Sequence, residues 1–254
     1  MSKFEIPVEP LESWSEFTEF LAREVWKEAP PQRGQYLFRG QADADWHLIS
    51  SFDRAISQSS SLNPDLEDRL LENFKKECES EPELKELTND PDQLSALAQH
   101  SGVPTRLLDW TDSPYVAAFF AFQGHLEDAI TADALSEYVA VWVLNKAAKI
   151  WQERRGVRVA AVQSWHNDRI RRQASYFTIS KTPFMTLEEF VESFEETGNE
   201  VPLIKVTLPV SEAQMALGNL DLMGINHASL FGGRDGMAKA ALIKTLLGRL
   251  ATTS

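Results

Sequence analysis

Two short segments of the chain combine charged and hydrogen-bonding residues with turn-forming ones, as a binding or catalytic site would. The first is Leu37-Phe38-Arg39-Gly40-Gln41, in which an apolar run ends in arginine and glycine. A planar guanidinium can hold a phosphate or a carboxylate, and glycine lets a ligand approach the backbone. Arg39 could equally hold a carboxylate of the chain itself, so the segment alone leaves both interpretations open.

The second segment runs from Gln99 to Pro114 and contains a histidine, an arginine, an aspartate and a tryptophan. Alternate side chains of a strand point to opposite faces, so Asp109 is expected on the face opposite Arg106. Because large apolar residues flank it, its carboxylate should be part-buried and should have a partner: Arg39, His100 or a helix N-terminus. A structural ion pair between sheet and helix is the alternative to a functional site.

His100 is a second titratable candidate, because the ordinary pKa of histidine lies near neutrality and suits general acid or base catalysis. Predicted in the last turn of a helix, it could instead cap that helix or lie in the core. The remaining histidines show no metal-ligand spacing, and the HExxH, GxxxxGK and GxGxxG patterns are absent. No metal site is therefore predicted.

Composition narrows the class of protein. The 254 residues are 43% hydrophobic and include seven Trp and fourteen Phe, which is enough for a substantial core. The single cysteine, Cys78, cannot form an internal disulfide and indicates a reducing compartment, so we expect a cytoplasmic protein. Neither an export signal nor an apolar run long enough to span a bilayer is present, so no membrane contact is expected.

A formal net charge of −13 argues against broad binding to nucleic acid, because most of the surface would repel a polyanion. The segment from Trp151 to Gln173 is the exception, since its arginines outnumber Glu153 and Asp168. These arginines run from Arg154 to Arg172. Such a patch is either a solvated helix face or a contact for a nucleotide phosphate, a nucleic acid or a protein partner.

Capping signals predict most of the helices. A Ser13-x-x-Glu16 capping box opens the first, and Ser or Asp before proline, at Asp90 and Ser113, opens two more. A helix should also follow Asn63-Pro64, Thr186 should cap another, and the last two should begin after residues 211 and 235. The helix from 115 to 122 is apolar on all sides and should be fully buried.

Apolar runs predict strands at 36–38, 105–110, 138–144, 176–179 and 203–208, with Arg39 at the end of the first. A further strand from Trp46 would form a hairpin with the first. The absence of repeats and long linkers favours a single domain over residues 1–254, with its core at about 15–250. The expected fold class is α+β, with a small mixed or antiparallel sheet flanked by helices.

Three parts of the chain resemble the FRG domain, a bacterial family named after a Phe-x-Arg-Gly-type signature. They are Leu37-Phe38-Arg39-Gly40, the run from Ala98 to Pro114, and the stretch from Leu222 to Phe231. The resemblance spans roughly residues 15 to 250, and its central run is specific. Because the activity of this family is poorly defined, the resemblance implies the type of domain but does not define a mechanism.

The order of an arginine on an early strand and Thr111-Asp112-Ser113 before a buried helix is also similar to ADP-ribosyltransferases. This resemblance implies an α+β fold of that kind and NAD as the ligand, with Arg39 on the pyrophosphate, Ser113 on the ribose and Trp110 stacking. The cofactor-binding residues would be Arg39, Gly40, Arg106, Trp110, Thr111 and Ser113. The catalytic residues would be Arg39, His100, Asp109 and Ser113.

The glutamate that ends the superfamily's R-S-E pattern is missing, because the comparable stretch is Asn226-His227-Ala228-Ser229. Either His227, Glu77 or Asp109 replaces it, or the pocket binds a nucleotide without turnover. The resemblance thus implies an NAD-directed enzyme, such as a toxin or an antiviral effector in phage defence. The alternatives are a non-catalytic module that binds a nucleotide, a nucleic-acid end or a protein partner, and a buried structural network of Arg39, Asp109 and His100.

Overall fold

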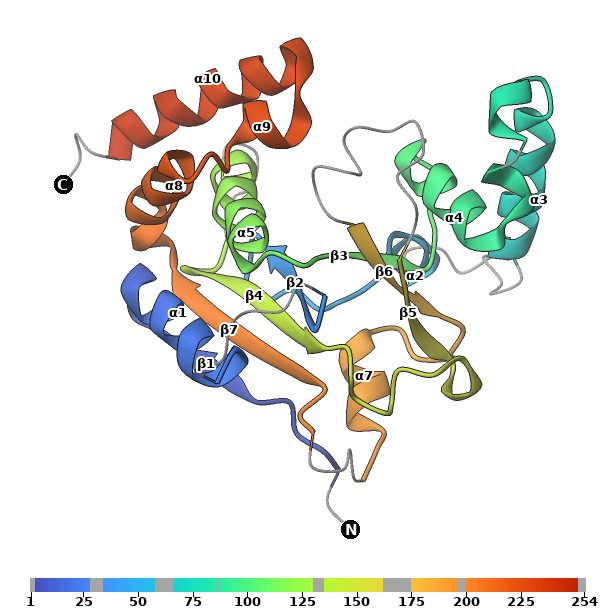
Figure 1. The fold of residues 1–254 in the computed structure, drawn as a ribbon, viewed down its shortest axis with the longest axis horizontal. Helices are drawn as coiled ribbons and strands as arrows, with labels where there is room; N and C mark the ends of the chain where they lie inside the picture. The colour runs from blue at the N-terminus through green and yellow to red at the C-terminus, as the bar shows by residue number, and fades with distance from the viewer. Residues whose placement is uncertain are drawn as a thin grey trace.

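The computed structural model describes residues 3–27, 34–57, 66–85, 87–129, 135–161, 175–195 and 200–250. Within them lies one open sheet with helices on both faces (Figure 1). Its order is β1-β7-β4-β2-β3-β6-β5, and all neighbours are antiparallel except the parallel pair β1 and β7. The expected α+β class with a mixed sheet is confirmed. The strands are β1 Val8–Pro10, β2 Tyr36–Gln41, β3 Leu107–Thr111, β4 Tyr138–Asn145, β5 Val157–Ala161, β6 Ser175–Ser180 and β7 Leu203–Pro209.

Helices make up the two covering layers. Five shorter turns also occur among the described residues: a π-helical turn at Leu21–Val25 and 3-10 turns at Pro82–Leu84, Leu87–Asn89, Glu153–Arg155 and Val210–Glu212. The α-helices are α1 Trp14–Phe20, α2 Ser51–Ser57, α3 Leu66–Cys78, α4 Pro91–His100, α5 Pro114–Asp128, α7 Leu187–Glu192, α8 Ala213–Leu222, α9 His227–Phe231 and α10 Gly233–Leu250.

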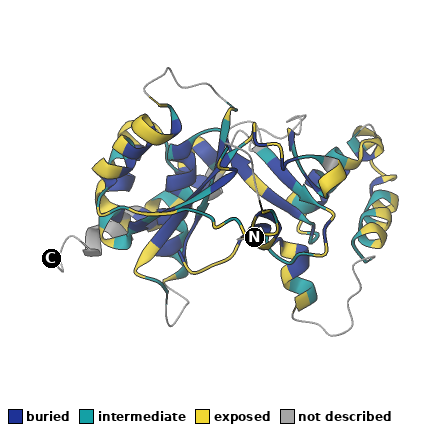
Figure 2. Ribbon diagram, turned by 90° about the horizontal axis from the view of Figure 1, so that it is seen from below, coloured by how far each residue is buried: buried dark blue, intermediate teal, exposed yellow. Residues whose placement is uncertain are grey.

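Strand β4 lies inside the sheet between β7 and β2, and six of its eight residues are buried because both faces are covered. On one face α1, α5 and α8 enclose the larger apolar cluster, and on the other α7 and residues 148–151 close a second cluster. Figure 2 shows the buried residues concentrated on the sheet and on the inward sides of these helices. As predicted, α5 is buried on nearly every side, although it extends to Asp128.

Three of the predicted caps are confirmed in full, whereas α8 begins at Ala213 after a 3-10 turn that contains Ser211, and α10 begins at Gly233, before Asp235. Asp90 accepts hydrogen bonds from the backbone of Asp92 and Gln93, Ser113 accepts one from Val116, and Thr186 with Glu189 forms a capping box. At the first helix Ser13 caps as predicted, but the Glu16 carboxylate accepts from Glu12 N–H, so the reciprocal half of that box is not formed. Asn63 and Pro64 lie outside the described residues.

The predicted hairpin after residue 38 is wrong. Arg39 lies inside β2 rather than at its end, and residues 42–50 form a loop with one isolated bridge, Ile49 to Thr186. The buried Asp43 fixes this loop, because its carboxylate accepts the backbone N–H groups of Asp45 at 2.7 Å and Ser136 at 2.9 Å. Both edges of β2 are already occupied, by β4 and by β3.

The two neighbours of β2 differ in a way that creates the site. The β2–β4 ladder runs over six residue pairs, whereas β2 and β3 pair only at Phe38 and Thr111. Beyond that pair the two strands no longer form a ladder, so part of β3 has no backbone partner on the β2 side. The space beside this separation is where the charged side chains of both strands meet.

Candidate functional site

A cavity of about 890 Å³ lies where β2 and β3 separate, and it is lined by these strands, the loop 42–49, α2, the end of α4 and one face of α5. This volume is at the upper end of the range of about 300–1,000 Å³ that small-molecule sites occupy. The cavity brings together six of the predicted site residues. They are Arg39, Gly40, His100, Asp109, Trp110 and Thr111.

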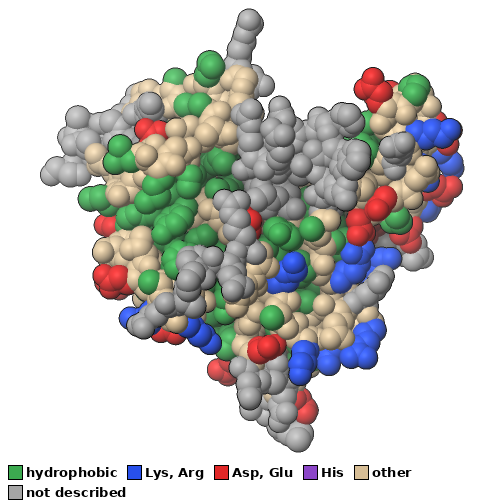
Figure 3. All heavy atoms as spheres, viewed as in Figure 1, with side chains coloured by type: hydrophobic (Ala, Val, Ile, Leu, Met, Phe, Trp, Pro, Cys, Tyr) green, Lys and Arg blue, Asp and Glu red, His purple; other side chains and the backbone are tan. Residues whose placement is uncertain are grey.

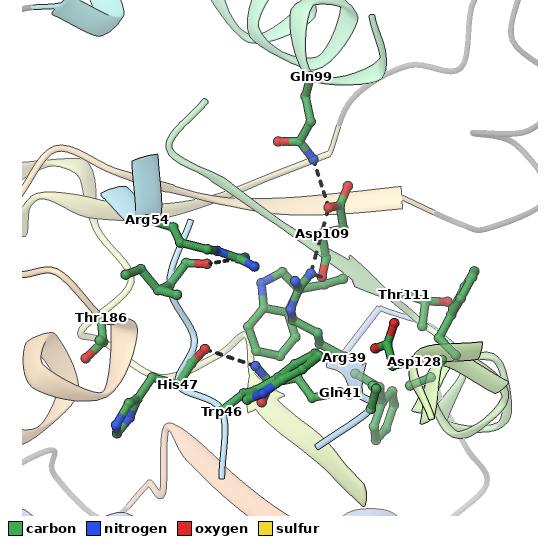
Figure 4. A pocket seen from close by; sticks show the side chains of 18 of the residues that line it. Arg39, Gln41, Trp46, His47, Arg54, Gln99, Asp109, Thr111, Asp128 and Thr186 are labelled. Carbon is green, nitrogen blue, oxygen red and sulfur yellow. Dashed lines mark hydrogen bonds and ion pairs between the residues drawn. The ribbon is translucent and has the colours of Figure 1, made fainter. Parts of the chain in front are cut away.

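Arg39 reaches across the gap from β2. Its Nη1 donates to the backbone oxygen of Asp109 at 2.9 Å and lies 3.8 Å from the carboxylate Oδ2 (Figure 4). Its Nε is buried and has no hydrogen-bond partner among the described residues. Burial lowers the pKa of the Arg39 guanidinium, the Asp109 carboxylate opposes that change, and the positive charge of Arg54 adds to it. The Arg39 side chain is 23% exposed and lines the cavity, and a guanidinium in that position can bind an anionic ligand.

Asp109 is held from two sides. Besides Arg39, Gln99 donates from Nε2 to Oδ2 at 2.8 Å, and the other end of the Gln99 amide accepts from Thr105 Oγ1 at 2.6 Å. The predicted pairing with Arg39 is therefore present, and Gln99 is an additional partner that the sequence did not reveal. The Asp109 side chain is 51% exposed, so the expectation of a part-buried carboxylate surrounded by apolar neighbours overstated its burial.

Three more cavity residues come from the loop, where a hairpin strand was predicted from Trp46, and from α2, which was not predicted. Trp46 is 43% exposed, His47 contacts Glu188 at 3.3 Å, and Arg54 points toward the Arg39–Asp109 pair in Figure 4. The loop is held by Gln41, whose amide donates to His47 O at 3.0 Å and accepts from Trp142 Nε1 at 2.5 Å. The polar residues that directly follow Arg39-Gly40 in the sequence were the signal that could have indicated a loop at the site.

Two predicted residues take no part in lining the cavity. Arg106 forms a buried ion pair with Asp53 at 3.1 Å, is 3.9 Å from Glu67 and lies over the Phe52 ring. Ser113 caps α5 and accepts from Val116 N at 3.3 Å. Both residues therefore have structural roles. Arg106 holds α2 and α3 at the start of β3, and Ser113 caps α5 after the end of β3.

Trp110 and Thr111, two predicted site residues at the end of β3, line the cavity but have little exposed surface. Trp110 is 2% exposed, and its indole N–H donates to Thr178 Oγ1 at 3.1 Å, which leaves no open face for stacking. Thr111 Oγ1 accepts the backbone N–H of Ser113 at 3.2 Å. His100 lies in the last turn of α4, as predicted, and is exposed at the cavity.

Gly40 has a packing reason rather than the expected role of opening the backbone to a ligand. A Cβ at this position would lie 2.0 Å from the carbonyl oxygen of Ala117 and 2.8 Å from the nitrogen of Ala121. Helix α5 thus passes directly over β2, and only glycine permits that approach. The close packing brings the α5 residues Phe120, Gly124 and Asp128 to the cavity wall.

The residues considered as substitutes for the missing glutamate are now placed. His227 is 2% exposed and packs between Phe119 and Phe231, and Glu77 lies on α3; neither lines the cavity. The acidic residues that do line it are Asp45, Asp109 and Asp128. Across the described part of the chain, no group of three or more His, Cys, Asp or Glu side chains is placed to hold a metal ion.

Of the basic segment predicted at 154–172, the structure describes only the beginning. Arg154 and Arg155 lie in a 3-10 turn, Glu153–Arg155, and Arg158 lies on β5, where it pairs with Asp92, so the expected helix face is absent there. Arg169, Arg171 and Arg172 lie outside the described residues. Among the helices that are described, none has the length and apolarity needed to cross a lipid bilayer.

The fold and the cavity together define an α+β domain with a large cavity lined by two arginines and three aspartates. Residues 34–129 match the family model of the FRG domain, so this chain carries an FRG domain. The matched region supplies every cavity-lining residue except Thr186. No match is found among curated proteins or among solved structures.

Proposed function

We propose that the FRG domain of this chain binds a nucleotide with a diphosphate, NAD or a related dinucleotide, in the cavity between β2 and β3. The observation that carries this proposal is the pair of arginines, Arg39 and Arg54, that line one large cavity, with Arg39 held in place by the backbone oxygen of Asp109.

The cavity lining holds the three aspartates Asp45, Asp109 and Asp128 beside two arginines, so it is the arginines and not the net charge that support a diphosphate. Arg39 and Arg54 both line the cavity, and the carboxylate beside them, Asp109, also accepts from Gln99. Two guanidinium groups can share the oxygens of a diphosphate, because each presents planar, parallel donors. Trp46 offers an exposed ring at the same cavity, and an aromatic face stacks on a base without sequence preference.

A catalytic role rests on Asp109. If NAD is the ligand, it supplies a ribose–nicotinamide bond whose cleavage can pass ADP-ribose to water or another acceptor. Asp109 presents a half-exposed carboxylate, oriented by Gln99 and Arg39, that can stabilise positive charge on a ribose or accept from its hydroxyl group. His100 is exposed at the same cavity and can donate or accept a proton. Such turnover is what a toxin or an antiviral effector of this kind would require.

The structure alters which residues this proposal uses. Ser113 was expected on the ribose and Arg106 on the ligand, but one caps α5 and the other is paired with Asp53. Arg54, Trp46 and Gln99 take their places in the proposed site. The alternative of binding without turnover uses the same cavity, and it differs only in predicting no release of nicotinamide.

The melting temperature with and without excess NAD tests binding. At about a hundred times its dissociation constant a ligand stabilises by roughly 2.7 kcal/mol, or about 5–10 °C for a chain of this length. The shift should disappear in Arg39→Ala and remain in Arg23→Ala, whose side chain is 69% exposed in the π-helical turn that follows α1. No shift at millimolar NAD, ADP or ADP-ribose contradicts the proposal.

Nicotinamide release then separates the enzyme from the binding module. An enzyme should lose turnover in Asp109→Asn while keeping the ligand-induced shift in melting temperature, because the amide is isosteric with the carboxylate. A non-catalytic binding module shows the shift in both the parent protein and Asp109→Asn, and neither protein releases nicotinamide.

A further inference from the structure

The connection between β4 and β5 presents a strongly basic surface on a chain whose net charge is −13. We propose that this surface binds the phosphate backbone of a nucleic acid. It consists of five exposed side chains, which we call the basic platform: Lys146, Lys149, Arg154, Arg155 and Lys181. Figure 3 shows Lys and Arg side chains gathered at the lower right of the molecule, at this end of the sheet.

The connection is rigid, because its apolar residues are anchored in the core. Ala148, Ile150 and Trp151 are all at most 8% exposed, and Trp151 Nε1 donates to Asn145 O at 2.8 Å. Backbone hydrogen bonds from Trp151 to Ala148 and from Arg155 to Gln152, at 3.2 and 2.8 Å, close successive turns. With the apolar side chains directed inward, the cationic ones are left on the outside.

Lys181 joins the platform through a second tight turn. Gly156 adopts a φ of +95°, and a Cβ there would lie 2.6 Å from Thr182 Cγ2, so this turn packs directly against residues 181–182. Lys181 N donates to Gly156 O at 2.7 Å. The contact places Lys181 beside the arginine pair that precedes the glycine.

Two of the platform cations contact aromatic rings, and a third, Arg154, donates from Nε to Gln152 Oε1 at 2.7 Å. The Arg155 guanidinium lies 5.1 Å from the centre of the Phe194 ring, and Lys146 Nζ lies 5.2 Å from that of Tyr176. Among the side chains that the structure describes, none of the five forms an ion pair with an acid, whereas the neighbouring Arg158 pairs with Asp92. Cations that lack an acidic partner among the described residues can bind a polyanion without first breaking an ion pair.

The composition of the platform favours nucleic acid over other anionic partners. A membrane-surface site needs apolar anchors besides its cations, and a protein interface needs apolar or aromatic residues at its centre. The described residues of this connection contribute none of the exposed large hydrophobic side chains of the protein. Nucleic-acid interfaces are more polar and more positive, and arginine pairs with phosphate through two parallel hydrogen bonds.

Fluorescence anisotropy with labelled 20-nucleotide single-stranded and duplex DNA and RNA tests the proposal at several salt concentrations. The platform variant is Lys149→Glu/Arg154→Glu/Arg155→Glu. The matched control, Arg69→Glu/Lys76→Glu/Lys85→Glu, removes the same positive charge from exposed positions on α3 and the turn after it. The melting temperatures of both variants verify that they are folded.

We expect at least one of these oligonucleotides to bind, with an affinity that falls as salt rises. The platform variant should weaken binding at least about tenfold at 100 mM salt and lower the salt slope by about 2–3, and the control should change affinity less than about twofold. Equal loss in both variants, absence of binding by the parent protein at 50 mM salt, or binding only to phosphatidylserine vesicles would each overturn the proposal. None of these results depends on whether the cavity binds NAD.

Discussion

At the scale of single residues, Gly40 shows how the family's signature positions the site. Adding a methyl group would place it 2.0 Å from Ala117 O, so α5 must move away from β2. We expect Gly40→Ala to destabilise the fold by about 3 kcal/mol or more, the upper range for overpacking, because the obstacle is backbone. Urea denaturation measures this change.

Gly218 provides the matched control for that substitution. It lies inside α8, and a Cβ there would meet nothing within 4 Å. Gly218→Ala should therefore stabilise the protein by about 0.5–1 kcal/mol through helix propensity. Equal effects of the two substitutions would show that the contact with α5 does not limit residue 40.

Arg106 is the second residue whose removal should affect the fold rather than the ligand. Its side chain is 14% exposed, and the carboxylates of Asp53 and Glu67 are 7% and 17% exposed. Arg106→Ala leaves both acids without their cation and should destabilise by about 3–5 kcal/mol. Arg39→Ala should cost much less, because Asp109 is half exposed and keeps Gln99. Denaturation midpoints of the two variants test this contrast, and a larger loss for Arg39→Ala would favour the buried structural network.

The residues of the site could be predicted from the sequence only in part. Arg39 and Asp109 stood out because a charged side chain in an apolar strand needs a partner. Arg106 is of the same residue type as Arg39, and Ser113 is a residue type that often binds ligands. Nothing in their spacing shows that Arg106 instead forms an ion pair with Asp53 or that Ser113 caps a helix. Trp46 and Arg54 depend on the path of the loop after β2, which is determined by long-range contacts such as Asp43 to Ser136.

At the scale of elements, α9 and α10 join α5 through a buried titratable group. His227 contacts Phe119 and stacks on Phe231 at 5.0 Å, and its Nε2 lies 3.9 Å from Glu127, which also pairs with Lys239. Burial lowers the pKa of His227 below its ordinary 6.5, Glu127 opposes this change and Lys239 adds to it. Both ring nitrogens lack hydrogen-bond partners among the described residues.

This lowered pKa makes stability depend on pH. Below 6.5 the unfolded chain binds a proton at His227 that the native state resists, so stability falls as pH falls from 6.5 toward the native pKa, by at most about 1.4 kcal/mol per pH unit. His227→Phe keeps the ring contacts and should flatten the change between pH 6.5 and 5. Urea denaturation across that range measures it, and an unchanged slope would show that His227 is not the group responsible.

Most helices could be predicted from local signals, although α2 and α9 were missed, whereas some strands could not. Asp90, Ser113 and Thr186 determine where helices begin through contacts within four residues. The hairpin failed because strand pairing is settled by partners far along the chain, and β2 pairs with β4 about a hundred residues later. Strand β5 was missed because its edge position tolerates arginine, which resembles a charged helix face in the sequence.

At the scale of the whole molecule, the FRG match covers the site but not the structure that supports it. Residues 34–129 contain β2 and β3, which pair at one position only, while the six-residue partner of β2 is β4 at 138–145. The larger core cluster also needs residues of α1 and α8, such as Phe17 and Leu217. The matched segment alone therefore lacks both the long partner of the central strand β2 and much of the apolar cover of the sheet.

We therefore expect a fragment of residues 34–129 to be largely unfolded, whereas residues 3–250 should unfold in one cooperative transition. An isolated two-stranded pairing is at best marginally stable in water, and here the two strands share a single register pair. Near-UV circular dichroism and dispersion of amide proton signals measure the difference. A fragment with native-like dispersion would show that the FRG domain folds by itself, and that the flanking residues form a separate unit rather than one domain with it.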